Sequence, residues 1–294
     1  MFSTLLYRLQ WALCFILFAL IVLGAGVRLA DAGLACPDWP LCFGELIPTF
    51  NTEIFLEWIH RKIALWVGVL ALVIAVWIWT KPSYRAGFGW WMLANLLLFC
   101  FQAVLGRETV TRFLDSYIVS AHLIGGYSLF ALNLWVAMKM RRWRRKETLD
   151  LPSESRGLQI FSYVFWVSVF GQTLLGGLVS TSYAGMACGS SFPLCLGQWI
   201  PPLHGAIALH FFHRVGGFFI LALACFAFYK SFKINDLLTK RLWQVVFGLV
   251  ILQIIWGIGM LHSQIHFGLS LLHSATSLLI FSLLAIGSYH VRYR

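Results

Sequence analysis

Charged residues are scarce in this sequence of 294 residues. Asp, Glu, Lys and Arg together make up 11% of it and apolar residues 60%, whereas an average soluble domain has about 25% charged and about 45–50% apolar residues. Such a chain lacks the polar residues needed to cover a water-facing surface. This excludes soluble, disordered and fibrous proteins and leaves an integral membrane protein. Acidic residues are scarcest, with 11 Asp and Glu against 22 Lys and Arg.

Long apolar runs are plentiful, as the mean hydropathy of +0.80 indicates. A bilayer core takes about 20 apolar residues per helix. The first run is too long for a secretory signal and lacks a convincing cleavage pattern, so we expect it to be retained. Eight spans are predicted, at roughly 11–30, 58–79, 88–106, 117–138, 159–180, 207–229, 241–261 and 269–290.

The excess of positive charge lies on one side of these predicted spans. Arg8, Lys81, Lys230 and Arg292 fall there, as does the dense basic run at 139–146, whereas most acidic residues fall on the other side. The positive-inside rule therefore predicts a multi-pass protein of the cell inner membrane with both termini in the cytoplasm. In this placement the basic run contacts anionic lipid, and no nucleic acid is expected as a partner.

The two halves of the chain form an internal repeat. Cys42 and His60 are 18 residues apart, as are Cys195 and His213. A parallel repeat predicts an all-α membrane protein of two four-helix bundles related by a pseudo-twofold axis along the membrane normal. We expect units at 1–140 and 158–294, joined by a basic cytoplasmic linker at 141–157. Other pairs in register are Ala32–Cys36 with Ala184–Cys188, Arg61 with Arg214, Gln102 with Gln253, Gly106 with Gly257, and His122 with His273.

Four histidines of the repeat, His60, His122, His213 and His273, lie inside predicted spans near their outer ends. Ionisable residues in spans usually face the bundle interior, and two facing imidazoles can hold a heme iron from both sides. Zinc fits less well, because no third and fourth ligand is expected at the same depth. A single such histidine would favour an interhelical hydrogen bond, but two level pairs favour two heme sites near the outer face.

Polar residues near these histidines leave several interpretations open. Arg61 and Arg214 each follow a histidine, and either pair with heme propionates or extend to the membrane interface. Gln102 and Gln253 are predicted to form hydrogen bonds between helices rather than to take part in catalysis.

The two halves differ beside the first histidine of each pair. Glu57 is three residues before His60 and shares its helix face, whereas the second half has His210 at that place. A carboxylate there can act as acid, base or stabiliser of a positive charge. The alternative is an ordinary acidic residue at the membrane interface. The first half therefore looks equipped for chemistry and the second for holding a cofactor.

Four of the seven cysteines lie in two matching outer loops, Cys36 with Cys42 and Cys188 with Cys195. The outer side of an inner membrane is oxidising. Each pair can form a disulfide that staples its loop over a heme edge, or a dithiol that exchanges electrons. The staple is the favoured interpretation for both pairs.

Three more histidines, His204, His262 and His266, also fall on the outer side. The last two are four residues apart, a spacing that can bind a metal. Their surroundings look like loop, so we expect solvated side chains.

The first outer loop and the residues after it resemble heme A synthases. The loop Gly33–Cys42 contains Cys-Pro-Asp-Trp-Pro-Leu-Cys and is followed by Glu57-x-x-His60-Arg61. Gln102-x-x-x-Gly106, His122, His213–Arg214 and His273 fit the same family, so the resemblance covers nearly the whole chain. This family oxidises a ring methyl of heme O to a formyl group, giving heme A for terminal oxidases.

The resemblance implies roles for particular residues. His213 and His273 would bind a heme b cofactor in the C-terminal unit, and His60 and His122 would bind the heme O substrate in the N-terminal unit. Glu57 would be the catalytic carboxylate. Cys36 and Cys42 would be a redox-active or disulfide pair. Cys188 and Cys195 are not part of the family's central motif, so the resemblance assigns them no definite role.

Two other functions compete with the synthase. A di-heme b-type cytochrome that only passes electrons would explain four histidines, but not Glu57 or the cysteine loop. A transporter or assembly chaperone would explain the repeat alone. Heme O synthase and an electron donor or acceptor are expected partners, and the sequence leaves a homo-oligomer open.

Overall fold

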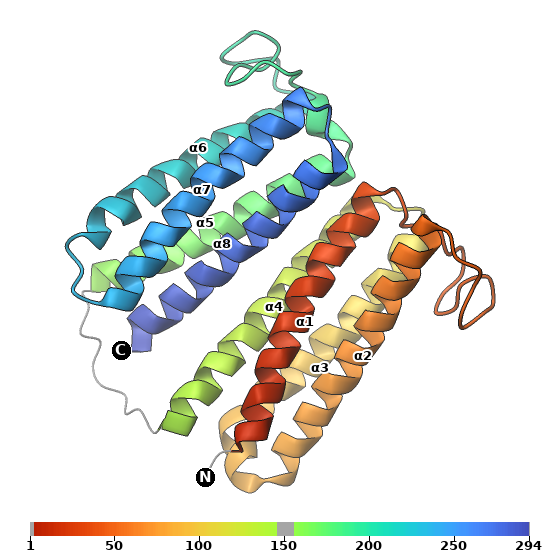
Figure 1. Cartoon of the computed structure of the whole chain (residues 1–294), viewed down its shortest axis with the longest axis vertical. Coiled ribbons are helices and arrows are strands. Elements are labelled where there is room, and N and C mark those ends of the chain that lie inside the picture. The colour runs from red at the N-terminus through yellow and green to blue at the C-terminus, as the bar shows by residue number, and fades with distance from the viewer. Residues whose placement is uncertain (1–2, 146–155, 294) are drawn as a thin grey trace. The chain divides into compact units, whose positions relative to one another are not determined.

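The structure, a computed structural model, describes residues 3–145 and 156–293. Eight helices within these residues are long and apolar enough to cross a membrane, which confirms the predicted all-α membrane fold. A short 3-10 helix, η1 at Ala184–Met186, precedes α6. The long helices are α1 Thr4–Leu29, α2 Thr52–Thr80, α3 Pro82–Thr111, α4 Ser116–Arg145, α5 Arg156–Thr181, α6 Gly205–Ser231, α7 Leu237–His262 and α8 Phe267–Tyr293 (Figure 1).

The helices extend beyond the apolar runs that predicted them, because capping residues outside those runs set their ends. α2 begins after Asn51, whose Oδ1 accepts a hydrogen bond from the N–H of Ile54 at 2.8 Å. This satisfies one of the N–H groups that a helix start leaves unpaired. α3 begins at Pro82, six residues before the predicted start, because a proline at the first helical position sacrifices no helical hydrogen bond.

The chain divides into two compact units, Met1–Thr148 and Leu149–Arg294. In the first unit α1 and α3 each pack against both α2 and α4. The four helices therefore form a closed ring in which α2 and α4 are diagonally opposite. α5 to α8 form the same ring in the second unit, with α6 and α8 diagonally opposite. The pseudo-twofold axis and the cytoplasmic termini stay predictions.

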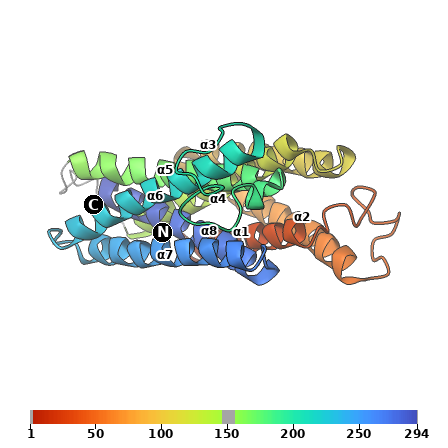
Figure 2. The same cartoon turned by 90° about the horizontal axis from the view of Figure 1, so that it is seen from above.

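Most of the predicted linker at 141–157 lies outside the described residues. Its described flanks, 141–145 and 156–157, belong to α4 and α5. The long connection between α1 and α2, residues 30–51, extends beyond the ends of the helices that it joins (Figures 1 and 2). The matching connection of the second unit precedes α6.

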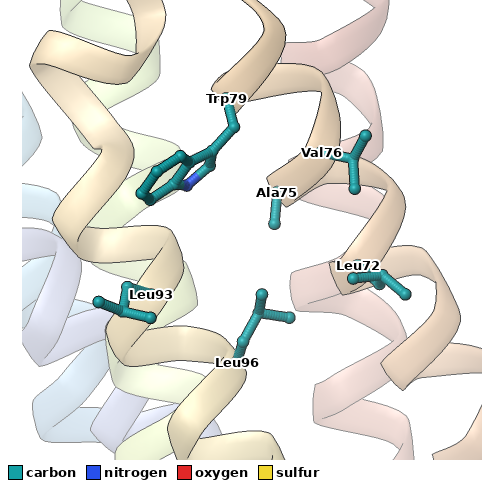
Figure 3. A pocket seen from close by; sticks show the side chains of 6 residues that line it. All are labelled: Leu72, Ala75, Val76, Trp79, Leu93 and Leu96. Atoms are coloured by element: carbon teal, nitrogen blue, oxygen red, sulfur yellow. The ribbon is translucent and has the colours of Figure 1, made fainter.

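An apolar groove of about 340 Å³ lies on α2 and α3 (Figure 3). No side chain of its lining can ligate a metal or move a proton. Leu72, in this lining, is twelve residues from His60 along α2, which is about 18 Å at the helical rise. The groove is therefore separate from the histidine sites. Its lining residues are Leu72, Ala75, Val76, Trp79, Leu93 and Leu96.

Candidate functional site

The first histidine of each unit packs against a glycine of the preceding helix. A Cβ placed on Gly24 of α1 would lie 3.0 Å from Cε1 of His60 on α2. In the second unit a Cβ on Gly176 of α5 would lie 2.9 Å from Cε1 of His213 on α6. A side chain at these distances would push the imidazole out of its position, so each imidazole occupies its place because the facing residue is glycine.

The second histidine of each unit has the same kind of neighbour. A Cβ on Gly106 of α3 would lie 3.4 Å from Cε1 of His122 on α4. A Cβ on Gly257 of α7 would lie 3.4 Å from Cε1 of His273 on α8. In both units the two histidines therefore come from the diagonally opposite helices of the ring. Each imidazole lies against the neighbouring helix that carries its glycine.

The two imidazoles of the second unit are spaced for one iron atom between them. The ring centroids of His213 and His273 are 6.5 Å apart, with 65° between the ring planes. A metal–nitrogen bond of about 2.0 Å and about 1.1 Å from nitrogen to ring centre, counted on both sides, give about 6.2 Å. Within the described residues no group of three or more His, Cys, Asp or Glu gathers as a metal site. The donor set therefore suits a heme, which supplies its own equatorial nitrogens.

Arg61 is held against the outer loop of its own unit. Its Nη1 donates to the carbonyl oxygens of Asp38 at 2.6 Å and Leu41 at 2.7 Å. Its Nη2 donates to the carbonyl oxygen of Cys36 at 3.0 Å and forms an ion pair with Glu57. Neither interpretation offered by the sequence, propionate pairing or extension to the interface, includes these contacts. The guanidinium is a clamp that ties the loop to α2.

Glu57 is buried, with 4% of its surface exposed. Besides the ion pair with Arg61, its Oε2 accepts a hydrogen bond from the N–H of Cys36 at 2.7 Å. Glu57 is therefore not a solvated side chain, and the alternative of an ordinary acidic residue at the membrane interface stays open as to its depth. A buried carboxylate is retained only where a positive charge and hydrogen bonds compensate its desolvation, and Arg61 and the loop supply both.

The second unit has the same clamp with a different partner. Arg214 donates to the carbonyl oxygens of Ser191 at 2.7 Å, Leu194 at 2.5 Å and Gly189 at 3.0 Å. Its Nε lies 3.3 Å from Nε2 of His210. His210 thus stands where Glu57 stands in the first unit, and its Nδ1 is 3.4 Å from the N–H of Cys188. Both residues anchor a loop, but only Glu57 brings a carboxylate.

Both predicted cysteine pairs form disulfides, Cys36 with Cys42 and Cys188 with Cys195. All four residues are buried, with at most 1% of their surface exposed. Each disulfide closes the loop whose carbonyls the clamp arginine holds. This geometry agrees with the staple interpretation.

Asp38 orders the turn inside the first loop. Its Oδ2 accepts from the N–H of Gly44 at 2.8 Å and its Oδ1 from the N–H of Phe43 at 2.6 Å. These two donors, with the positive charge of Arg61, hold the pKa of the Asp38 carboxyl below its ordinary value. The carboxylate is therefore ionised near neutral pH and keeps the turn closed.

The remaining predicted residues are three exposed histidines and a glutamine that lacks its predicted hydrogen bond. His204, His262 and His266 are exposed, as predicted for solvated side chains. Gln102 packs into the space left by Gly125, and its Nε2 has no hydrogen-bond partner in the described part of the chain.

The sequence also contains signals that point to unpredicted contacts. Gly24 and Gly176 recur in the register of the repeat and mark the places where the first histidines pack. Gln172 also makes a contact that the sequence did not predict, because its side chain lies against His213. Unlike the two glycines it does not recur in the repeat, since its counterpart in the first unit is a leucine. His290 Nε2 lies at hydrogen-bond distance, 2.9 Å, from Oδ2 of Asp236, away from the four histidines.

Known proteins resemble this chain over nearly its whole length. Residues 7–54 and 48–285 match the profile of a family described as cytochrome oxidase assembly protein. A heme A synthase from Shewanella oneidensis is 31% identical to it, over 96% of each chain. One from Alkalihalophilus pseudofirmus is 34% identical, over 89% of each chain. One from Beijerinckia indica is 24% identical, over 92% of this chain and 88% of its own.

Proposed function

Since this chain belongs to the cytochrome oxidase assembly protein (COX15-CtaA) family, we propose that it is a heme A synthase. The observation that carries this conclusion is its likeness over 96% of both chains to a protein of that name. The reaction converts the ring methyl of heme O to a formyl group, with a hydroxymethyl stage between them. Overall the methyl carbon gains one oxygen atom and loses four electrons and two of its three hydrogens.

We assign the two histidine pairs different hemes. His213 and His273 bind heme b, the resident cofactor, which supplies electron transfer when bound. His60 and His122 bind heme O, the substrate. The difference between Glu57 and His210 supports this assignment, because only the first unit places a carboxylate beside its histidine.

Glu57 is the residue to which we assign the chemistry. A positive charge that develops at the ring methyl during its oxidation is stabilised by a nearby carboxylate. Arg61 and the N–H of Cys36 fix the position of this carboxylate, so it needs no reorganisation during the reaction. The Cys36–Cys42 loop thus positions Glu57 in addition to covering the site.

The test of this role is Glu57→Gln in protein supplied with heme O. The variant should bind heme O and form little heme A, because the amide keeps the shape of the side chain and loses its charge. Glu53→Gln, an exposed acid one turn earlier on α2, is the matched control and should convert heme O normally. Pigments are extracted and separated by chromatography. Full conversion by Glu57→Gln would refute the assignment.

The same extraction separates the synthase from the di-heme cytochrome. A synthase yields heme B with heme O or heme A, whereas a cytochrome yields two heme B per chain. The likeness to named heme A synthases favours the enzyme.

We further propose a cell inner membrane location with the heme sites near the outer face. The one-sided basic residues of the sequence support this orientation. Heme O synthase and a redox partner are the proteins that the reaction calls for, since one supplies the substrate and the other removes electrons.

A further inference from the structure

The two histidines of the second unit have hydrogen-bonding partners at Nδ1. His273 Nδ1 lies 3.1 Å from the backbone carbonyl oxygen of Gln253. A carbonyl only accepts, so this ring carries its hydrogen on Nδ1 and leaves Nε2 free to ligate a metal. His213 Nδ1 lies 3.1 Å from the side-chain amide nitrogen of Gln172, which also donates to the His213 carbonyl at 2.8 Å.

The two histidines of the first unit lack such partners. Nδ1 of His60 and Nδ1 of His122 are buried, and neither has a hydrogen-bond partner in the residues that the structure describes. The units thus share their glycine contacts and differ in the hydrogen-bond partner of Nδ1 in each imidazole.

The difference at the first histidine follows from the residue below the facing glycine. Gln172 is four residues before Gly176, so it lies one helical turn along the same face of α5. The residue four before Gly24 on α1 is Leu20, which is buried and has no polar atom to offer His60.

A second position removes the room for an amide in the first unit. A Cβ on Gly216 would lie 2.1 Å from Gln172 Oε1, so this glycine makes the space that the amide fills. Gly216 is three residues after His213, and the residue three after His60 is Ile63. Two differences in sequence, glutamine against leucine on one helix and glycine against isoleucine on the other, therefore explain why the first histidine has an Nδ1 partner only in the second unit.

A partner at Nδ1 strengthens an imidazole as a metal ligand. It fixes the ring's orientation and tautomer and makes the ring more electron-donating, and removing it typically weakens metal binding about 10–100-fold. A buried N–H without a partner also destabilises the ligated form, which needs hydrogen on Nδ1. The ring that lacks a partner is thus the weaker ligand.

We propose that Gln172 is a positioning residue that makes the second unit the site of tight, permanent heme binding. The Gln253 carbonyl does the same for His273. The first unit lacks both contacts and so binds its heme weakly enough for substrate to enter and product to leave. This inference rests on the proposed function, which assigns the cofactor to one unit and the substrate to the other.

The Gln172 amide can serve both forms of the His213 ring. As the structure has it, Nε2 donates to an unprotonated Nδ1 and to the His213 carbonyl oxygen. Half a turn about the Cγ–Cδ bond presents Oε1 to an Nδ1 that carries hydrogen and gives up the bond to that carbonyl. The second of these forms is the one that ligates iron through Nε2.

The test compares three variants with the parent protein loaded with heme b. Gln172→Leu installs the residue of the first unit, and Gly216→Ala leaves the glutamine but displaces its amide. Gly217→Ala is the matched control, because a Cβ there would lie 3.9 Å from Gln172 Nε2, an ordinary contact. The rate at which apomyoglobin takes heme from each protein and the midpoint potential of the bound heme are measured.

We expect Gln172→Leu and Gly216→Ala to release heme about 10–100-fold faster than the parent, and Gly217→Ala to match the parent. The midpoint potential should rise in the first two, because a less electron-donating imidazole favours ferric iron less. Gln172→Glu should keep the heme and lower the potential, since a carboxylate is a stronger acceptor. A merely structural role would not produce shifts of opposite sign. If Gln172→Leu does not fold, Gly216→Ala carries the same test.

Release at the parent rate by both Gln172→Leu and Gly216→Ala would overturn the inference. His213→Ala distinguishes this failure from that of the proposed function, which requires this variant to lose the spectrum of six-coordinate heme b. The reciprocal double variant Leu20→Gln with Ile63→Gly should slow the release of heme from the first unit. An unchanged rate there would show that the missing partner does not set exchange.

Discussion

Removal of the Arg61 guanidinium should open the first loop far more than removal of Arg214 opens the second. Each arginine donates to three loop carbonyls, so Arg61→Leu and Arg214→Leu lose the same three contacts. Arg61→Leu also leaves the carboxylate of Glu57 buried beside the loop without its ion-pair partner, whereas Arg214→Leu leaves an imidazole that needs no charge. The difference in loop opening between the two variants therefore measures the effect of one unpaired buried carboxylate.

The magnitude follows from the burial of Glu57, which is 4% exposed. Removing one partner of a buried ion pair costs about 3–5 kcal/mol. Taking about 3 kcal/mol as the excess over Arg214→Leu, the open population of the first loop should be about a hundredfold larger.

Reduction of the buried disulfides reports this opening, because a reagent reaches them only when the loop opens. Purified protein is exposed briefly to a water-soluble phosphine, trapped with a maleimide and analysed as peptides. In each variant the loop of the other unit, in the same molecule, is the internal reference. If each variant speeds the reduction of the disulfide in its own loop by the same factor, the argument from the unpaired carboxylate is wrong. If neither does, the arginines do not clamp the loops.

Two further predictions concern the same loop and the glycine contacts. The lowered pKa of Asp38 means that its hydrogen bonds contribute fully above the ordinary carboxyl pKa and are lost as pH falls through the lowered one. The ratio of the Cys36–Cys42 reduction rates of the parent and of Asp38→Asn, which cancels the pH dependence of the reagent and of every other group, should thus stay below one and constant from pH 7 to about pH 4 and rise towards one below it; a rise near neutrality would contradict this. Gly176→Ala should lower heme content more than Gly257→Ala, because the added Cβ would meet its histidine ring at 2.9 Å rather than 3.4 Å; equal heme-to-protein absorbance ratios would count against the contact argument.

The helices were predictable because a span needs only a long apolar run, and their ends were not. α3 begins at Pro82, before the apolar run, because its first turn contains polar residues that a hydropathy window excludes. The histidines were predictable because an imidazole is conspicuous in an apolar span and recurs in the repeat. The partners of Arg61 were not, because they are backbone carbonyls brought together only when the loop folds.

Gln172 was missed for a different reason. A comparison of the two halves selects positions that agree, and Gln172 stands opposite Leu20. Its role depends on Gly216, which is distant in sequence and contacts it only across two packed helices. A search of the repeat for positions that disagree near a shared histidine would have found Gln172, Gly216 and Glu57 together.

The two loops also bear on why Glu57 is a carboxylate. The clamp needs a residue that contacts both the arginine and the N–H of the first cysteine, and in the second unit His210 does so. The shared frame of arginine, disulfide and loop carbonyls is therefore compatible with an imidazole at this place. A buried carboxylate is the more costly choice, because its charge must be desolvated and then compensated. Since the loop can be anchored without it, anchoring does not explain the charge of Glu57, and this supports our proposal that the carboxylate stabilises positive charge on the heme O substrate.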